Sequence, residues 1–253
     1  MERRKSKEIK IGSVKIGADH PIAVQSMTFT KTANADATVE QILSLERAGC
    51  DIVRFSVPDE ESAKSISYIK EHTHIPLVAD IHFNYKLALA ALERGIDKIR
   101  INPGNIGSPE RIKAVADACR MRGVPIRIGV NGGSLEKHIL AKYGSPTPEA
   151  LCESALYHVR LLEQFDFTDI VVSIKSSDVA DTVRANRLFA EKTDYPLHLG
   201  VTEAGTERMG IIKSSAGIGS LLLDGIGDTI RVSLTDEVEK EGAAARDLLK
   251  ALG

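Results

Sequence analysis

Several features that would place a chain in a special class are scarce or missing from this sequence. No apolar run is long enough to cross a bilayer, and residues 1–7 are polar and basic, unlike the apolar core of a signal peptide. Lys and Arg together number 33 against 35 for Asp and Glu, so neither sign of charge dominates. That balance argues against a broad nucleic-acid-binding surface. We therefore expect a soluble cytoplasmic protein with no membrane partner and no nucleic-acid partner.

Cysteine is scarce as well. Cys50, Cys119 and Cys152 lie far apart in the sequence, and none belongs to a Cys-x-x-Cys motif. Such residues are typical of reduced, small apolar side chains in a protein interior. The pattern contains no complete metal or cluster site, so we predict no metal ligands in this chain.

The sequence does contain a regular alternation of short β-rich runs and longer helical patterns. The runs that we expect to form strands are residues 21–27, 51–57, 76–82, 98–104, 125–131, 169–177, 196–202 and 229–234. The helices expected to follow them are residues 38–48, 59–72, 84–94, 108–122, 147–165, 178–193, 206–222 and 236–251.

Eight such units in a chain of 253 residues predict an α/β fold, a closed (β/α)₈ or TIM barrel. We expect one domain over residues 1–253, without a linker or a second domain. Ahead of the first unit, Ile9–Ile16 is expected to form a small hairpin that plugs the bottom of the barrel.

The predicted strands carry apolar residues at one parity and polar or charged residues at the other. In residues 98–104, for example, Ile99 and Ile101 alternate with Arg100 and Asn102. Since the apolar set must face the helices, the polar set is expected to point into the barrel. The basic residues placed there are Arg54, Arg100, Arg127, Lys175 and Arg231.

So much positive charge in one lumen is costly without counter-charge, and Asp80 and Glu203 cannot neutralise all of it. A multiply charged anion at the barrel mouth would do so, and arginine forks fit phosphate oxygens. The sequence therefore predicts a diphosphate-bearing small molecule at the C-terminal face of the barrel. The alternative is that each arginine closes a structural ion pair with a loop carboxylate.

Other residues at the predicted strand ends suit catalysis or ligand binding. Asp80 and His82 share one face, so Asp80 could orient His82 or bind a substrate hydroxyl, unless the two form a structural pair. Glu203 is a proton-transfer candidate, although it could also be a helix N-terminal residue. The segment 131–134 could be a substrate loop or merely a turn, and the same choice stays open for the glycines between residues 217 and 227.

The predicted strand ends contain, in this order along the chain, the segments VQSMT (24–28), VRFSVP (53–58), ADIHF (79–83), RINPGN (100–105), RIGVNGGS (127–134), SIKSSD (173–178), LHLGVTEAG (197–205) and DGIGDTIRVSLT (224–235). Together these segments resemble a known family, 4-hydroxy-3-methylbut-2-enyl diphosphate synthase. The resemblance implies an oxidoreductase of the non-mevalonate pathway of isoprenoid (isoprene) biosynthesis. It would convert 2-C-methyl-D-erythritol 2,4-cyclodiphosphate to an allylic diphosphate by reductive ring opening and loss of water.

By motif position, the resemblance also implies roles for individual residues. Glu203 matches the proposed acid–base carboxylate, and Asp80 and His82 join it as catalytic candidates. The residues implied in substrate binding are Arg54, Arg100, Asn102, Arg127, Asn131, Lys175, Arg231 and Ser233.

The resemblance further implies a 4Fe–4S iron–sulfur cluster, held by three cysteines and a glutamate on a separate C-terminal domain. The cysteines of this chain do not match those ligands, so we expect the cluster domain to be absent and the chain alone to be inactive. The resemblance also implies flavodoxin or ferredoxin as electron donor and a homodimeric full-length enzyme.

Two other functions stay open at this point. One is a non-catalytic barrel that only binds a phosphorylated ligand. The other is a transferase that resembles dihydropteroate synthase, but the predicted lumen is very cationic for a flat neutral pterin, and the chain has no tryptophan to stack on one.

Overall fold

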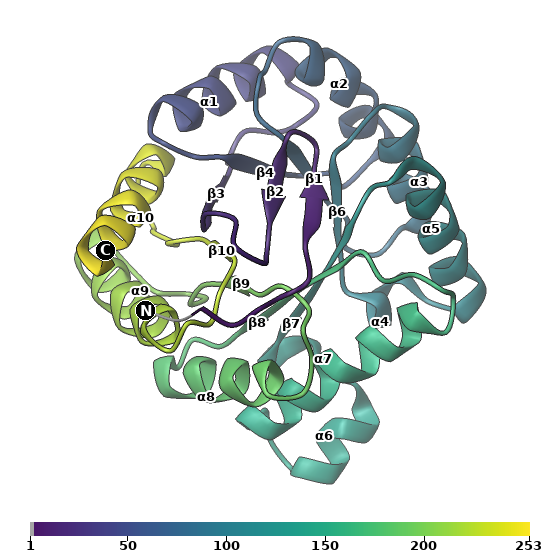
Figure 1. Ribbon diagram of the computed structural model, residues 1–253. Helices are drawn as coiled ribbons and strands as arrows, with labels where there is room; N and C mark the ends of the chain where they lie inside the picture. The colour runs from purple at the N-terminus through teal and green to yellow at the C-terminus, as the bar shows by residue number, and fades with distance from the viewer. Residues whose placement is uncertain (1–2) are drawn as a thin grey trace.

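The computed structural model describes residues 3–253 and contains the predicted (β/α)₈ barrel (Figure 1). Eight parallel strands pair in the order β8-β7-β6-β5-β4-β3-β10-β9, and a parallel bridge between Val172 and Leu197 joins the two ends of that sheet. The strands are β3 (Ala23–Met27), β4 (Ile52–Ser56), β5 (Leu77–Asp80), β6 (Lys98–Ile101), β7 (Ile126–Asn131), β8 (Ile170–Lys175), β9 (His198–Leu199) and β10 (Thr229–Ile230).

The last two strands are much shorter than the sequence predicts. Their pairing nevertheless continues beyond the strand ends, because Arg231 N donates to Leu199 O at 2.9 Å and Thr202 N donates to Ser176 O at 3.1 Å. The chain therefore stays beside its neighbours at the barrel mouth while it leaves regular strand geometry.

Each strand is followed by a helix, and these helices form the outer ring seen in Figure 1. They are α1 (Ala35–Arg47), α2 (Glu60–Glu71), α3 (Tyr85–Glu93), α5 (Pro109–Arg122), α7 (Pro148–Glu163), α8 (Val179–Ala190), α9 (Glu207–Leu223) and α10 (Val238–Leu252). Two short helices, α4 (Pro103–Ile106) and α6 (Lys137–Tyr143), were not predicted, because one or two turns are too short to show a helical period. Among the described residues, no helix is long and apolar enough to cross a membrane.

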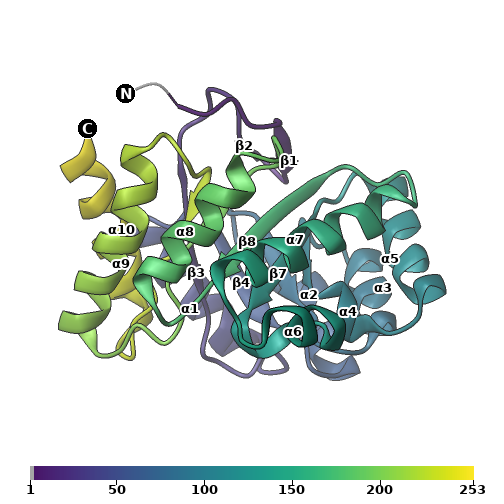
Figure 2. The same ribbon diagram turned by 90° about the horizontal axis from the view of Figure 1, so that it is seen from below.

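The predicted N-terminal hairpin is present and closes one end of the barrel. Its strands β1 (Ile9–Ile11) and β2 (Val14–Ile16) pair antiparallel, and Figure 2 shows them at the end opposite α4 and α6. Three isoleucines of the hairpin pack on apolar residues at the starts of the barrel strands; the cluster comprises Ile9, Ile11, Ile16, Ala23, Ile52, Val78 and Val171. This end of the barrel is therefore sealed by apolar side chains.

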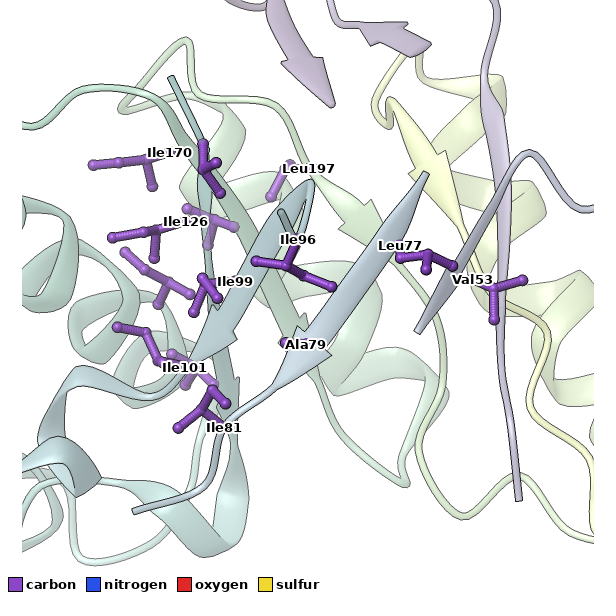
Figure 3. Packing of buried hydrophobic residues seen from close by; sticks show 14 of the residues in the cluster. Val53, Leu77, Ala79, Ile81, Ile96, Ile99, Ile101, Ile126, Ile170 and Leu197 are labelled. Atoms are coloured by element: carbon purple, nitrogen blue, oxygen red, sulfur yellow. The ribbon is translucent and has the colours of Figure 1, made fainter. Parts of the chain in front are cut away.

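The larger apolar core lies between the strands and the helices. Figure 3 shows part of it, with outward-facing residues such as Leu77, Ile99, Ile126 and Ile170 gathered on one side of the sheet. Alternation along each strand therefore leaves the other set of side chains to fill the lumen.

Strand register stacks those inward side chains in layers of four from alternate strands, as in other barrels of this kind. From the hairpin upward, the four layers are Ile52, Lys98, Val171 and Thr229; then Gln25, Val78, Arg127 and His198; then Arg54, Arg100, Ser173 and Arg231; and finally Met27, Asp80, Gly129 and Gly200. The lumen thus changes from apolar to cationic over a few residues of each strand.

Candidate active site

A cavity of about 290 Å³ opens at the mouth of the barrel, where the strands end. All five basic residues predicted from strand parity line it. The full lining is Met27, Arg54, Asp80, His82, Arg100, Arg127, Gly129, Val130, Asn131, Ser173, Lys175, Thr202, Arg231 and Ser233.

Asp80 holds two of these arginines in place. Arg100 Nη1 donates to Asp80 Oδ1 at 2.9 Å, and Arg54 Nε lies 3.6 Å from Oδ2. Burial by itself would raise the pKa of Asp80, but Arg54 and Arg100 outweigh it and hold that pKa below its ordinary value. Asp80 is therefore an anion between two cations. Arg54 is fixed from its other side by Met27, whose sulfur accepts from Nη2 at 2.9 Å.

Arg231 is paired with a residue that the sequence did not point to. Its guanidinium donates to both carboxylate oxygens of the buried Glu241 on α10, at 3.0 Å each. Ser26 Oγ and Leu234 N donate to the same carboxylate at 2.6 and 3.1 Å. Arg231 therefore forms an ion pair, although with a carboxylate of a helix rather than of a loop, and its role in substrate binding stays a prediction. Only the helical position of Glu241 at the barrel wall could have signalled this pair.

Arg127 and Lys175 have no comparable carboxylate. Arg127 is almost fully buried, and within residues 3–253 its Nε and Nη1 have no hydrogen-bond partner. Lys175 Nζ lies 3.5 Å from Nε2 of His198, whose Nδ1 lies 2.6 Å from Thr229 Oγ1. Burial lowers the pKa of Lys175, and the positive charges of Arg127 and Arg231 lower it further; burial and the same cationic surroundings lower the pKa of His198. The lumen is thus short of negative charge, as the sequence predicts.

Two glycines make room for the basic side chains. A Cβ on Gly129 would lie 2.6 Å from Arg100 Nη2, and one on Gly200 would lie 2.7 Å from Lys175 Nζ. Both cations therefore lie flat across the neighbouring strand because that strand carries no side chain there.

The remaining predicted site residues divide into two groups. His82, Asn131 and Ser233 line the cavity, whereas Asn102 and Glu203 do not. Asn102 is buried beyond the end of β6, where its Oδ1 accepts from Gly104 N at 3.0 Å and caps α4. Its parity pointed into the lumen, but the strand stops at Ile101 and the chain turns into α4, so strand alternation no longer applies.

Glu203 lies at the rim. It is exposed, in the left-handed backbone region with φ +50°, and it lines a neighbouring groove of about 590 Å³ that shares Asn131 and Thr202 with the cavity. Its side chain therefore does not neutralise the lumen, in contrast to Glu241.

The described residues do not fit an iron–sulfur cluster. No three His, Cys, Asp or Glu side chains among residues 3–253 are grouped so that they could hold a metal ion. Cys50, between α1 and β4, Cys119, in α5, and Cys152, in α7, are free and buried. Burial raises the pKa of Cys50 to about 12 and that of Cys152 to about 11. These thiols are inert apolar residues rather than ligands.

The sequence is similar to one well-defined family. The family model for the GcpE TIM-barrel domain matches residues 6–246. The chain is 60% identical over 247 residues to the 4-hydroxy-3-methylbut-2-en-1-yl diphosphate synthase (flavodoxin) of Caldicellulosiruptor saccharolyticus, covering 98% of this chain and 71% of that protein. A protein of the same name from Nitratiruptor sp. is 61% identical, with 100% of this chain and 71% of the relative covered.

Solved structures with a similar fold are much more distant in sequence. Type I 3-dehydroquinate dehydratase from Clostridium difficile superposes with a TM-score of 0.70 at 15% identity, covering 98% of both chains. Dihydropteroate synthase from Xanthomonas albilineans gives a TM-score of 0.66 at 16% identity, covering 97% of both chains. At these identities the likeness shows the barrel fold alone.

Proposed function

Because this chain belongs to the 4-hydroxy-3-methylbut-2-en-1-yl diphosphate synthase family, as its GcpE TIM-barrel domain, we propose that its cavity binds 2-C-methyl-D-erythritol 2,4-cyclodiphosphate. The observation that carries this proposal is the unneutralised positive charge of the lumen. Asp80 and Glu241 balance only part of the charge of the five basic residues that line the cavity. A cyclic diphosphate supplies the missing negative charge and accepts hydrogen bonds from guanidinium groups.

The geometry also suggests how the work is divided among the polar residues. Arg100, Arg127 and Lys175 bind the diphosphate directly, while Asp80 acts by orienting Arg54 and Arg100, since both of its oxygens face guanidinium groups. Asn131, His82 and Ser233 are placed to contact the ligand from the rim of the cavity.

Glu203 is the proton donor or acceptor candidate at the neighbouring rim. Its exposed position allows it to exchange protons with water, and the groove it lines is continuous with the cavity through Asn131 and Thr202. Asn102 acts through α4, which it caps, and positions the loop that follows β6.

The full reaction is the reductive opening of the cyclodiphosphate ring with loss of water, an oxidoreductase step in isoprenoid biosynthesis. We propose that it takes place in the cytoplasm, with flavodoxin or ferredoxin as electron donor, and in a homodimer. The 4Fe–4S cluster that the resemblance implies would have its ligands on a C-terminal domain outside this barrel, because the barrel cysteines do not fit it.

The test is a calorimetric titration of this chain with methylerythritol cyclodiphosphate. We expect saturable binding, weakened about ten- to hundredfold by Arg100→Met, the range for a charge-assisted contact in a partly buried site. Arg122→Met is the matched control, because Arg122 is exposed on α5, outside the barrel, and should leave the affinity unchanged.

A parallel titration with a pterin addresses the transferase alternative. Pterin binding without cyclodiphosphate binding would contradict the proposed substrate. Equal affinities of the wild type and Arg100→Met for the cyclodiphosphate would place the ligand outside this cavity.

A further inference from the structure

Below the cavity, the lumen contains polar side chains that the proposed function does not use. Lys98 and Gln25 are buried in the two lowest layers, next to Arg127. Within residues 3–253, five of their nitrogen and oxygen atoms have no hydrogen-bond partner: Lys98 Nζ, Arg127 Nε and Nη1, and Gln25 Nε2 and Oε1. Buried polar atoms are nearly always paired in native proteins, so this cluster requires an explanation.

Within residues 3–253, the surroundings of Lys98 in the lumen contain positive charge and no carboxylate. Arg127 and His198 lie in the layer above it, and Arg54, Arg100 and Arg231 lie in the layer above that. Lys175 reaches into the same space from the end of β8, beside His198. The other groups that face Lys98 are Thr229, Gln25, Ser173, the aliphatic residues of its own and the next layer, and the apolar hairpin below.

The nearest acid along the lumen is Asp80, in the fourth layer, which is already shared by Arg54 and Arg100. Glu241 is taken up by Arg231 in the same way. A protonated Lys98 would therefore be a buried charge among like charges. Guanidinium groups keep their proton in proteins, whereas a buried lysine gives its proton up readily.

Burial lowers the pKa of Lys98 well below its ordinary value, and the positive charges of Arg127 and Arg54 lower it further. A diphosphate in the cavity would reverse this balance, because its two negative charges would lie just above Arg127. The neutral amine of Lys98 can then add a positive charge from below the cavity, as Lys175 and His198 can from beside it.

We propose that Lys98 is uncharged in the ligand-free barrel and takes up a proton when an anionic diphosphate enters the cavity, so that binding and proton uptake are coupled. The step is the conversion of an amine and a proton from the solvent to an ammonium group. The inference rests on the proposed function for the identity of the ligand, but not for the state of Lys98 before binding.

The first experiment needs no ligand and compares the wild type with Lys98→Met, which has a similar size and no charge. At pH values between the folded-state and the unfolded-state pKa of Lys98, its side chain is protonated in the unfolded chain and neutral in the folded protein. Folding then releases a proton, so the stability of the fold rises with pH in this range. The thermal midpoint of the wild type should therefore rise, relative to Lys98→Met, as the pH increases from 7 to 10. Lys98→Met should be the more stable protein at pH 7.

Lys10→Met is the matched control, because Lys10 is exposed on the hairpin, on the side away from the lumen. It should follow the wild type at every pH. Parallel pH profiles for the wild type and Lys98→Met would overturn the inference, since they would mean that Lys98 is charged in the folded protein.

The second experiment measures proton uptake on binding. Titrations with methylerythritol cyclodiphosphate at pH 7.5 are run in Tris and in HEPES. Their observed enthalpies differ by the number of protons taken up multiplied by the difference between the ionisation enthalpies of the two buffers. We expect net proton uptake on binding by the wild type and by Lys10→Met. Lys98→Met should take up as much as one proton less, and its affinity for the cyclodiphosphate should be about tenfold weaker than that of the wild type. Lys175 and His198 account for any uptake that remains.

Uptake that is the same in the wild type and in Lys98→Met would overturn the coupling even if the ligand binds. Failure of the cyclodiphosphate to bind would instead overturn the proposed substrate. The coupling is then tested with inorganic pyrophosphate as the ligand. Pyrophosphate changes its own ionisation on binding, but this change is the same for both proteins, so the difference in proton uptake between the wild type and Lys98→Met reports on Lys98 alone. If pyrophosphate shows no such difference, or does not bind, the coupling is overturned too.

Discussion

At its lower end the lumen of this barrel is packed largely by aliphatic side chains, with Lys98 buried among them, and is closed by the hairpin, whereas at its upper end it is lined by arginines and lysine. The same strands build both ends. In β4, for instance, Ile52 packs on the hairpin and Arg54, two residues later on the same face, lines the cavity. The comparison teaches that stability and ligand chemistry are separated along the strand direction, not between different strands.

Glycines show the same division. At the lower end, Gly17 and Gly227 have φ values of +82° and +127°, and a Cβ on them would lie 2.1 Å from Lys7 O and 2.5 Å from Leu199 Cδ1. At the mouth, a Cβ on Gly129 would meet only the flexible end of Arg100. Substitution should thus unfold the lower end and reshape the upper one.

The largest effect is expected at the hairpin. Ile11 is fully buried there, so Ile11→Ala should lower the free energy of unfolding by about 2–5 kcal/mol through lost burial and the cavity left behind. Urea denaturation measures this loss. Val14→Ala, at a partly buried position of the same hairpin, should cost clearly less. If both variants cost the same, the hairpin is not the plug that the packing indicates.

The next effect concerns Asp80, the acid that lies between Arg54 and Arg100. Asp80→Asn should destabilise the fold by about 3 kcal/mol at pH 7, because it leaves Arg54 and Arg100 buried without their counter-charge. The pKa of Asp80 is lower in the folded protein than in the unfolded chain. The carboxylate therefore stabilises the fold fully at pH values above the unfolded-state pKa, and this stabilisation is lost as the pH falls through the folded-state pKa.

The wild type and Asp80→Asn should accordingly converge in stability below about pH 4, the range in which an unperturbed Asp titrates. Chemical denaturation across pH 2–7 gives both curves. Asp19→Asn, at an exposed site near the hairpin, should change neither. A constant difference down to the lowest pH would show that the carboxylate charge is not what stabilises the site.

A smaller effect is expected at Gly129, and on binding rather than on stability. Gly129→Ala should displace the Arg100 guanidinium and weaken cyclodiphosphate binding by about tenfold, a loss of roughly 1.4 kcal/mol. Gly133→Ala is the control at the same end, where the nearest atom to a new Cβ, Asn131 Oδ1, is 3.5 Å away. Equal affinities of the two variants would mean that the position of Arg100 does not matter.

The smallest effect is predicted for the cysteines, which belong to neither end of the lumen. Because burial raises the pKa of Cys50 to about 12 and that of Cys152 to about 11, we expect negligible alkylation of the native chain by iodoacetamide at pH 8. Mass spectrometry should find modification only after denaturation. Rapid labelling of the native protein would contradict the packing around these residues.

Sequence reasoning succeeded where local pattern and tertiary environment agree. The eight strands and their helices follow from alternation and helical period, and the five basic lumen residues follow from parity alone. The strand predicted over residues 98–104 was too long, because β6 ends at Ile101 and Asn102 caps α4; the role of Asn102 in substrate binding stays a prediction. We also expected from the sequence that Glu203 neutralises part of the positive charge of the lumen. In the structure Glu203 lies in the neighbouring groove, and Glu241 of α10 neutralises Arg231 instead.

The sequence by itself therefore determined the barrel, the plug at its base and the sign of the charge in its lumen, since these depend on the period and polarity of neighbouring residues. Only the tertiary structure decided which cations are paired, through Asp80 and Glu241, and which are left without a partner, such as Arg127 and Lys98. The physical reason is that pairing depends on strand register and helix packing, which bring together residues as far apart in sequence as Ser26 and Glu241.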